Sequence, residues 1–149
     1  PISIVVGKHC RGVIIPVAWA RSNAYLATFD GSWSPTTNDV DVAQAAIAEY
    51  FAEASTDEKQ DPQLRRGFAH RLENLKNNRI QWVGVYVGKE RRILCNALPP
   101  EREGNDFWTV HYTGWRRRFI RVHGDVPGAW SIRYDPDRRE CSLYRWSGF

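Results

Sequence analysis

Histidine is the side chain best suited to acid–base chemistry near neutral pH, and the sequence contains four: His9, His70, His111 and His123. His111 is the best candidate for a general base, because it stands in "WTVHYTG" close to Asp106 and Tyr112. With Asp106 and Tyr86 it forms the candidate catalytic set, if the protein is an enzyme. The alternative is that His111 is a hydrogen-bonded or surface histidine of a strand.

No motif of a known chemistry accompanies these residues. The sequence has no GxSxG, HExxH, P-loop or Rossmann fingerprint. Its cysteines, Cys10, Cys95 and Cys141, form neither a CxxC pair nor a Cys/His cluster with zinc-like spacing, so we expect no metal and no cofactor. Cys95 and Cys141 stand in apolar strands and are expected to be buried thiols. Without an assembled catalytic set, a binding or interaction protein is favoured over an enzyme.

Arginine is concentrated in the second half of the chain. Residues 1–78 carry eight Lys/Arg and nine Asp/Glu, whereas residues 79–149 carry thirteen and eight, and twelve of those thirteen are arginine. The planar guanidinium suits carboxylate and phosphate partners. The net charge of +4 therefore indicates attraction to anions without identifying one.

The stretch "WRRRFIRVHGD" at 115–125 carries four of these arginines, and its alternation predicts a strand over 117–123. Because successive side chains of a strand point to opposite faces, its arginines are expected on an exposed face shared with the strands at 130–134 and 141–146. This candidate binding surface consists of Arg117, Phe119, Arg121, Arg133 and Arg145. The residues expected to be buried are Ile120, Val122, Trp130, Ile132, Tyr134, Tyr144 and Trp146.

An acidic protein or another anionic partner is the expected occupant of this basic face. Non-specific binding to nucleic acid is an alternative, although the aromatic signature of RNA-recognition modules is absent. Two further alternatives are that the basic face forms a homodimer contact or simply contributes to solubility. The enzyme alternative is an NTF2-like protein that holds a small ligand in a pocket between helices and sheet.

Two helices are predicted between residues 38 and 78. Asn38 or Asp39 is expected to cap the first, whose apolar side chains recur at helical spacing. Asp61 followed by Pro62 predicts the start of the second. Its buried side is expected to carry Leu64, Phe68, Leu72 and Leu75. A solvated face is expected to carry Arg65, Arg66, Arg71 and Lys76.

From residue 79 onward the hydrophobic period changes to two, which predicts antiparallel strands. "RIQWVGVYVG" and "RRILCNAL" flank the turn "GKER" and indicate a hairpin. "DFWTVHY" and "RRFIRVH" are two further predicted strands. "AWSIRY" and "ECSLYRW" flank "DPDRR", where Pro136 suits a tight turn.

Helices followed by a strand meander predict an α+β fold, with two helices on one face of a five- to six-stranded antiparallel sheet. The arrangement is typical of cystatin-like or NTF2-like architectures. The length fits a single domain, 1–149, with a short β-type segment at 1–30, helices at 38–78 and strands at 79–149.

Residues 2–6 and 12–19 are predicted to be short β-type segments, the second at an edge or irregular because of Pro16. A cytoplasmic location is expected; the alternative is export, if residues 1–20 are a signal segment. No stretch is long enough to span a membrane. "PISIVV" is similar to the start of tautomerases, which use a terminal proline as base. Their first strand leads quickly into a long helix, however, whereas here a segment with glycine, basic residues and proline follows, so ordinary removal of methionine is the favoured explanation of Pro1.

Several turn and core motifs occur in a distinctive order. "WSPT" at 33–36 precedes a helix, "RRILCN" at 91–96 is a strand ending in Asn, and "HGDVPGAWSIRYDPDRRECSLYRW" closes the chain. In this order the chain resembles a group of small uncharacterised bacterial proteins, many of them exported lipoproteins, over about two-thirds of its length. It departs from them in lacking paired glycines in the last loop and a lipobox cysteine. The resemblance implies the fold and supplies no activity or site residues.

Overall fold

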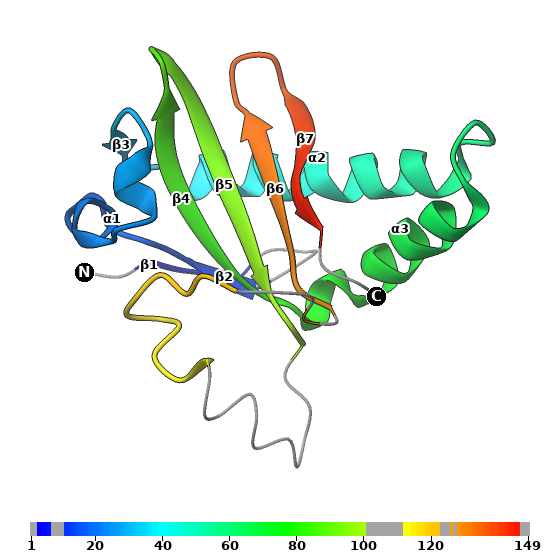
Figure 1. Ribbon diagram of the computed structural model, residues 1–149, viewed down its shortest axis with the longest axis horizontal. Helices are drawn as coiled ribbons and strands as arrows, with labels where there is room; N and C mark the ends of the chain where they lie inside the picture. Colours follow the sequence, from blue (N-terminus) through cyan, green and yellow to red (C-terminus); the bar gives the residue numbers. More distant parts are fainter. Residues whose placement is uncertain (1–2, 7–10, 101–111, 123–125, 127, 147–149) are drawn as a thin grey trace.

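A mixed β-sheet with helices forms the frame of the protein, so the α+β class is confirmed (Figure 1). The computed structural model describes residues 3–6, 11–100, 112–122, 126 and 128–146. The strands are β1 (Ser3–Val6), β2 (Arg11–Ile14), β3 (Ser32–Trp33), β4 (Arg79–Val87), β5 (Glu90–Leu98), β6 (Trp130–Asp135) and β7 (Glu140–Trp146). The helices are α1 (Val17–Ser22), α2 (Thr37–Thr56) and α3 (Pro62–Asn74), with 3-10 turns η1 (Leu26–Thr28) and η2 (Leu75–Asn77).

The sheet is not fully antiparallel, which corrects the prediction from the sequence. Its order is β1-β2-β4-β5-β6-β7, and β3 also pairs with β4. The meander β4–β7 is antiparallel as predicted, but β2 runs parallel to β4. The chain between β2 and β4 contains all three helices, enough for the crossover that a parallel pair requires. Gly12 permits the close approach, because a Cβ there would lie 2.6 Å from Nε1 of Trp82.

The predicted β-type segment at 12–19 is shorter in the structure. β2 ends at Ile14, and the amide of Ile15 still donates to the carbonyl of Trp82 at 2.9 Å. Pro16 then stands at the N-cap of α1, whose first residue is Val17. Proline lacks an amide hydrogen and is tolerated at a helix start, so it ends the strand and precedes the helix.

Helix α2 begins two or three residues earlier than predicted. Its N-cap is Thr36, not Asn38 or Asp39: the Thr36 hydroxyl accepts from the amide of Asp39, and the Asp39 carboxylate accepts from the amide of Thr36. This reciprocal capping box satisfies two amides that would otherwise lack partners. The predicted apolar stripe is present and buried at Val40, Ala43, Ile47 and Phe51.

Helix α3 starts as predicted, with Asp61 as N-cap and Pro62 as first residue. Its buried stripe, however, is rotated relative to the prediction. Leu64 is 41% exposed, whereas Arg71 is only 3% exposed and donates to the carbonyl of Gly67. Arg71 lies at helical spacing between the buried residues Phe68 and Leu75, so it shares their side of the helix. Burial lowers the pKa of the Arg71 guanidinium to about 10.

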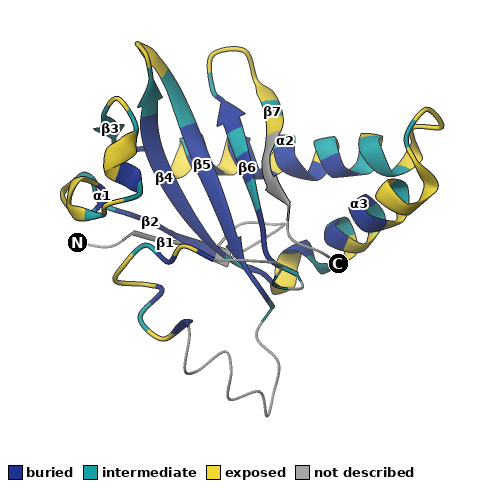
Figure 2. Ribbon diagram, in the orientation of Figure 1, coloured by how far each residue is buried: buried dark blue, intermediate teal, exposed yellow. Residues whose placement is uncertain are grey.

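The sheet is covered on both faces, and buried side chains run along its central strands (Figure 2). α2 crosses one face, with α3 packed beside it (Figure 1). The core on that face contains Phe51, Trp82, Cys95, Trp130 and Ile132. The opposite face is covered by α1, η1 and the segment 112–122, whose core residues include Leu26, Val83, Leu94, Trp115, Ile120 and Val122.

The segment 117–122 is not a strand, which corrects a second prediction. Residues 113–117 form turns, and 119–122 have no regular structure. Ile120 and Val122 are nevertheless buried as predicted, and so are Trp130, Ile132 and Tyr134. These two sets pack on opposite faces of the sheet rather than on one. The side chains of Tyr144 and Trp146 lie outside the described part of the structure.

An ion-pair network joins the ends of two hairpins. Arg138 donates to Glu90 at 3.0 Å and to Asp135 at 2.9 Å, and Arg92 also pairs with both carboxylates. Hydrogen bonds from Arg138 and Arg92 lower the pKa of Glu90. Burial by itself would raise the pKa of Asp135, but hydrogen bonds from Arg138 and from the amide of Asp137 outweigh it and lower that pKa.

Replacing Thr36 by alanine removes the capping hydroxyl of α2. We expect the free energy of unfolding to fall by about 1 kcal/mol, the typical cost of losing such a cap. Urea denaturation followed by circular dichroism measures it. Thr37→Ala is the control, because Thr37 is the first residue within the helix and makes no capping bond. An equal loss in both variants would contradict the role of Thr36.

Because of the carboxylates in this network, the stability of the fold should depend on pH. Because the folded-state pKa values of Glu90 and Asp135 lie below their ordinary values, their contribution is present above about pH 5. It is lost as the pH falls through the folded pKa values. We expect Glu90→Gln to flatten the fall of the melting temperature on acidification, measured by scanning calorimetry. The control Glu58→Gln, at an exposed residue, should keep the wild-type slope.

Candidate functional site

A row of polar side chains crosses the centre of the sheet on the face opposite α2. Gln81 in β4 pairs in register with Asn96 in β5, and Asn96 pairs with Ser131 in β6. We call these three residues the polar row. Their neighbours on the same face of β4 and β5 are apolar, so the row interrupts a buried apolar surface. Buried polar groups are costly unless they are hydrogen-bonded, so the partners of the row matter.

The side-chain amide of Gln81, which is fully buried, uses its whole hydrogen-bonding capacity. Its nitrogen donates to the carbonyls of Trp115 and Arg118, both at 2.6 Å. Its oxygen accepts from the amide of Ile120 at 2.9 Å and from Nδ2 of Asn96 at 3.0 Å. Two donors and two acceptor positions are all that a glutamine side chain offers. Gln81 therefore fastens the segment 115–120 to the sheet.

Asn96 completes the attachment of this segment. Its Nδ2 donates to the carbonyl of Ile120 at 2.8 Å, in addition to Gln81. The amide and the carbonyl of Ile120 are thus both satisfied by side chains of the polar row. A strand would satisfy them with a neighbouring backbone, and this difference explains how 117–122 stays close to the sheet without joining it.

Tyr25 and Phe29 meet this segment from the other side. The side-chain oxygen of Asn23 accepts from the amides of Tyr25 and Leu26, both at 3.0 Å, and Leu26 is buried beneath them. The Tyr25 ring contacts Phe29 edge-on and lies nearly parallel to the ring of Phe119, with centroids 6.0 Å apart. Residues far apart in the sequence are thereby joined in one aromatic cluster.

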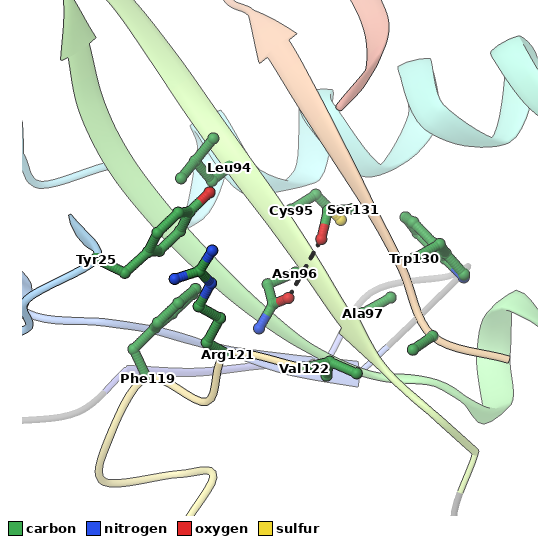
Figure 3. A pocket seen from close by; sticks show the side chains of 11 residues that line it. Tyr25, Leu94, Cys95, Asn96, Ala97, Phe119, Arg121, Val122, Trp130 and Ser131 are labelled. Carbon is green, nitrogen blue, oxygen red and sulfur yellow. Dashed lines mark hydrogen bonds between the residues drawn. The ribbon is translucent and has the colours of Figure 1, made fainter. Parts of the chain in front are cut away.

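A cavity of about 270 Å³ lies between these elements and the sheet (Figure 3). Asn96 and Ser131 of the polar row are small enough to leave this space, which Tyr25 and Phe119 border on one side. The cavity is lined by Tyr25, Leu94, Cys95, Asn96, Ala97, Phe119, Arg121, Val122, Ala129, Trp130 and Ser131. It lies on the face opposite α2 and α3, not between those helices and the sheet as the NTF2-like alternative required.

Arg121 is the charged residue of this lining. Its side chain is exposed, and its guanidinium carbon lies 4.5 Å from the centroid of the Tyr25 ring. The lining contains no carboxylate, and Arg121 makes no ion pair within the described part of the chain. A guanidinium over an aromatic ring is held in place without being neutralised. The cavity therefore has positive potential on the side of Arg121.

The structure brings together three of the five residues of the predicted basic face. Phe119 and Arg121 line the cavity, and Arg133 is linked to them through Phe29, whose ring centroid lies 5.7 Å from its guanidinium carbon and whose ring contacts Tyr25. Arg117 is exposed in a turn and is not part of the lining. Arg145 pairs in register with Ser131, and its side chain lies outside the described residues.

The described structure contains one residue of the candidate catalytic set, so the set stays a prediction. His111 and Asp106 lie outside the described residues. Tyr86 stands near the turn end of β4, where its backbone pairs with Gly31, and it does not line the cavity. Cys95 is buried as predicted and Cys141 is half-buried; burial raises the pKa of the Cys141 thiol to about 12, so this thiol is protonated at neutral pH.

Neither a metal-binding cluster nor a membrane-spanning helix occurs within the described residues. No group of three or more His, Cys, Asp or Glu side chains within the described ranges is arranged to hold a metal ion. None of the described helices combines the length and the apolar character needed to cross a membrane.

Sequence reasoning missed the polar row and the aromatic pair Tyr25 and Phe29. A signal existed for the row: Gln81 and Asn96 interrupt two apolar strands at positions equidistant from the hairpin turn, so they must face each other. Tyr25 and Phe29 are four residues apart, a helical spacing, but their contacts with Phe119 and Arg133 depend on distant parts of the chain.

No protein-family model, curated protein or solved structure matches the chain. The resemblance to small bacterial proteins and the cystatin-like or NTF2-like architecture therefore stay predictions. The site rests on the geometry described above.

Replacing Gln81 by alanine leaves the backbone groups of Trp115, Arg118 and Ile120 without their partner. Each buried group left unsatisfied costs about 1–3 kcal/mol. We expect the free energy of unfolding to fall by about 3 kcal/mol in urea denaturation, because water reaches some of these groups. The control is Gln63→Ala at an exposed position of α3, which should change stability little. A similar small change in both variants would contradict the fastening role of Gln81.

Proposed function

We propose that the protein is a binding protein that takes a small organic anion in the cavity between the sheet and the segment 119–122, with Arg121 as the anchor. The observation that carries the proposal is the Arg121 guanidinium beside an aromatic-lined cavity, with no carboxylate among the described residues of the lining. A carboxylate or phosphate of a ligand supplies the missing negative charge, and arginine holds such groups by paired hydrogen bonds.

The rest of the lining favours a ligand with an apolar or aromatic body. Leu94, Val122 and Ala129 supply aliphatic surface, and Tyr25 and Phe119 supply two nearly parallel rings. Ligand sites combine such apolar walls with a few polar groups that set the orientation of the ligand. An acidic side chain of a partner protein would reach Arg121 but would leave the inner part of the cavity empty, so a small ligand is the better fit.

The volume sets the size of the ligand. At about 30 Å³ for each water molecule, a cavity of about 270 Å³ has room for about nine waters, and hence for a ligand of about ten non-hydrogen atoms. Benzoate is a probe of this size. At about 0.3 kcal/mol for each atom, its dissociation constant is expected in the millimolar range.

The other interpretations have less support from the site. The described lining contains no histidine, aspartate, glutamate or lysine side chain to act as a general base. Nucleic acid requires several cations along an open surface. Here Arg121 and Arg133 are each packed against an aromatic ring.

Benzoate binding tests the proposal. We expect benzoate to bind the wild type and benzamide, its neutral analogue, to bind at least tenfold more weakly. Arg121→Ala should weaken benzoate about tenfold, because a hydrogen bond to a charged group contributes about 1.5–3 kcal/mol, and should leave benzamide unchanged. Titrations followed by amide chemical shifts in NMR spectra measure both constants and locate the site.

Arg117→Ala is the matched control, because it removes the same charge from an exposed arginine of the same segment outside the lining. It should keep the wild-type affinity for benzoate. If both variants lost benzoate affinity equally, the effect of Arg121→Ala would come from net charge alone. Binding of an acidic peptide or an oligonucleotide in place of benzoate would overturn the small-ligand proposal.

A further inference from the structure

The inner side of the cavity offers hydrogen-bond acceptors rather than donors. The Ser131 hydroxyl donates to Oδ1 of Asn96 at 3.3 Å, so its single hydrogen points into the polar row and not into the cavity (Figure 3). Both hydrogens of the Asn96 amide are used, for Gln81 and for the carbonyl of Ile120. What Ser131 and Asn96 still present is oxygen lone pairs.

The direction of these hydrogen bonds is fixed by Gln81. Its oxygen accepts from the amide of Ile120 and its nitrogen donates to two carbonyls, so the Gln81 amide has one orientation that satisfies all its partners. Gln81 in turn fixes Asn96 with its nitrogen toward Gln81 and its oxygen toward Ser131. A rotated Asn96 would place its NH₂ against Ser131 and leave the carbonyl of Ile120 without a donor. The acceptor character of the inner cavity is therefore built into the polar row.

We infer that the ligand carries a hydrogen-bond donor, a hydroxyl or an amino group, at the end opposite its anionic group. This inference rests on the proposed function, in which Arg121 binds the anion. Arg121 and Ser131 come from different elements of the lining and lie apart, with Asn96 between them and the apolar side chains of Leu94 and Val122 to either side (Figure 3). The ligand class is thus a small hydroxy- or amino-substituted aromatic or apolar acid, bound with its donor toward Ser131 and its acid group toward Arg121.

Selectivity follows from the same geometry. A donor satisfies the lone pairs of Ser131 and Asn96, which an unsubstituted ring would desolvate without replacement. A second acceptor at that end, such as an ether oxygen or another carboxylate, would face those lone pairs and be rejected. Sites that hydrogen-bond a polar group of their ligand discriminate strongly against analogues that lack it.

The test compares benzoate with its 3- and 4-hydroxy derivatives and with 4-methoxybenzoate, by the same NMR titrations. We expect at least one hydroxybenzoate to bind the wild type about fivefold more tightly than benzoate, the gain from one net hydrogen bond. The methoxy compound, whose oxygen has no hydrogen to donate, should bind no more tightly than benzoate. In Ser131→Ala the hydroxyl gain, taken as the ratio of the benzoate and hydroxybenzoate dissociation constants measured on the same variant, should shrink to less than twofold.

Benzoate-induced shifts at the same lining amides show that Ser131→Ala keeps its cavity. Ser34→Ala, at an exposed serine outside the lining, is the matched control that should keep the full hydroxyl gain. Arg121-dependent benzoate binding without any hydroxyl gain, or with a gain that persists in Ser131→Ala, would overturn the inference and leave the proposed function standing. Absence of binding by benzoate and both hydroxybenzoates would overturn both. If Ser131→Ala loses benzoate as well, Ser131→Cys, which keeps the volume with a weaker acceptor, must lower the hydroxyl gain selectively; an undiminished gain there overturns the inference.

Discussion

The buried amide of Gln81 is the interaction on which the site depends. It donates to Trp115 and Arg118 and accepts from Ile120, so three backbone groups of one irregular segment are satisfied by one side chain of the sheet. An unpaired buried backbone group is costly, and the sheet supplies no neighbouring strand to pair with this segment. Without the Gln81 amide, the segment that carries Phe119 and Arg121 would no longer be held at a fixed distance from β5 and β6. The cavity would then lose one of its walls.

The two faces of the sheet differ in how completely they are packed with apolar side chains. On the face covered by α2, the central strands contribute tryptophans, isoleucines and a tyrosine that pack against Phe51 and its neighbours. On the other face the polar row takes the place of apolar side chains, and the covering elements are short. Because close packing excludes a ligand as well as water, a cavity with polar groups requires a face where packing is incomplete. The apolar core under α2 compensates for the stability lost where the other face is incompletely packed.

The sequence predicts most of the elements whose contacts are local. The hairpins β4–β5 and β6–β7 and the starts of α3 and β5 follow from turn residues and hydrophobic period. The parallel contact of β2 with β4 and the course of 115–122 depend on residues far apart in the chain, which periodicity does not report. "RRFIRVH" has the alternation of a strand because Ile120 and Val122 do face a core. No local pattern reveals that the amide and the carbonyl of Ile120 are bound by the side chains of Gln81 and Asn96 and not by a neighbouring strand.

Two of the predicted binding residues lie in surroundings that differ from the prediction. Arg121 and Arg133 were expected side by side on an open pleated face, where they would act as a basic surface. In the structure each is packed on a ring, Tyr25 or Phe29, and Arg121 borders a cavity. A cation on an open face is solvated on nearly all sides and attracts anions weakly. The Tyr25 ring, from a distant part of the sequence, holds the exposed Arg121 guanidinium at the edge of the cavity, and in the proposed function this fixed position makes it the anchor of one anionic group.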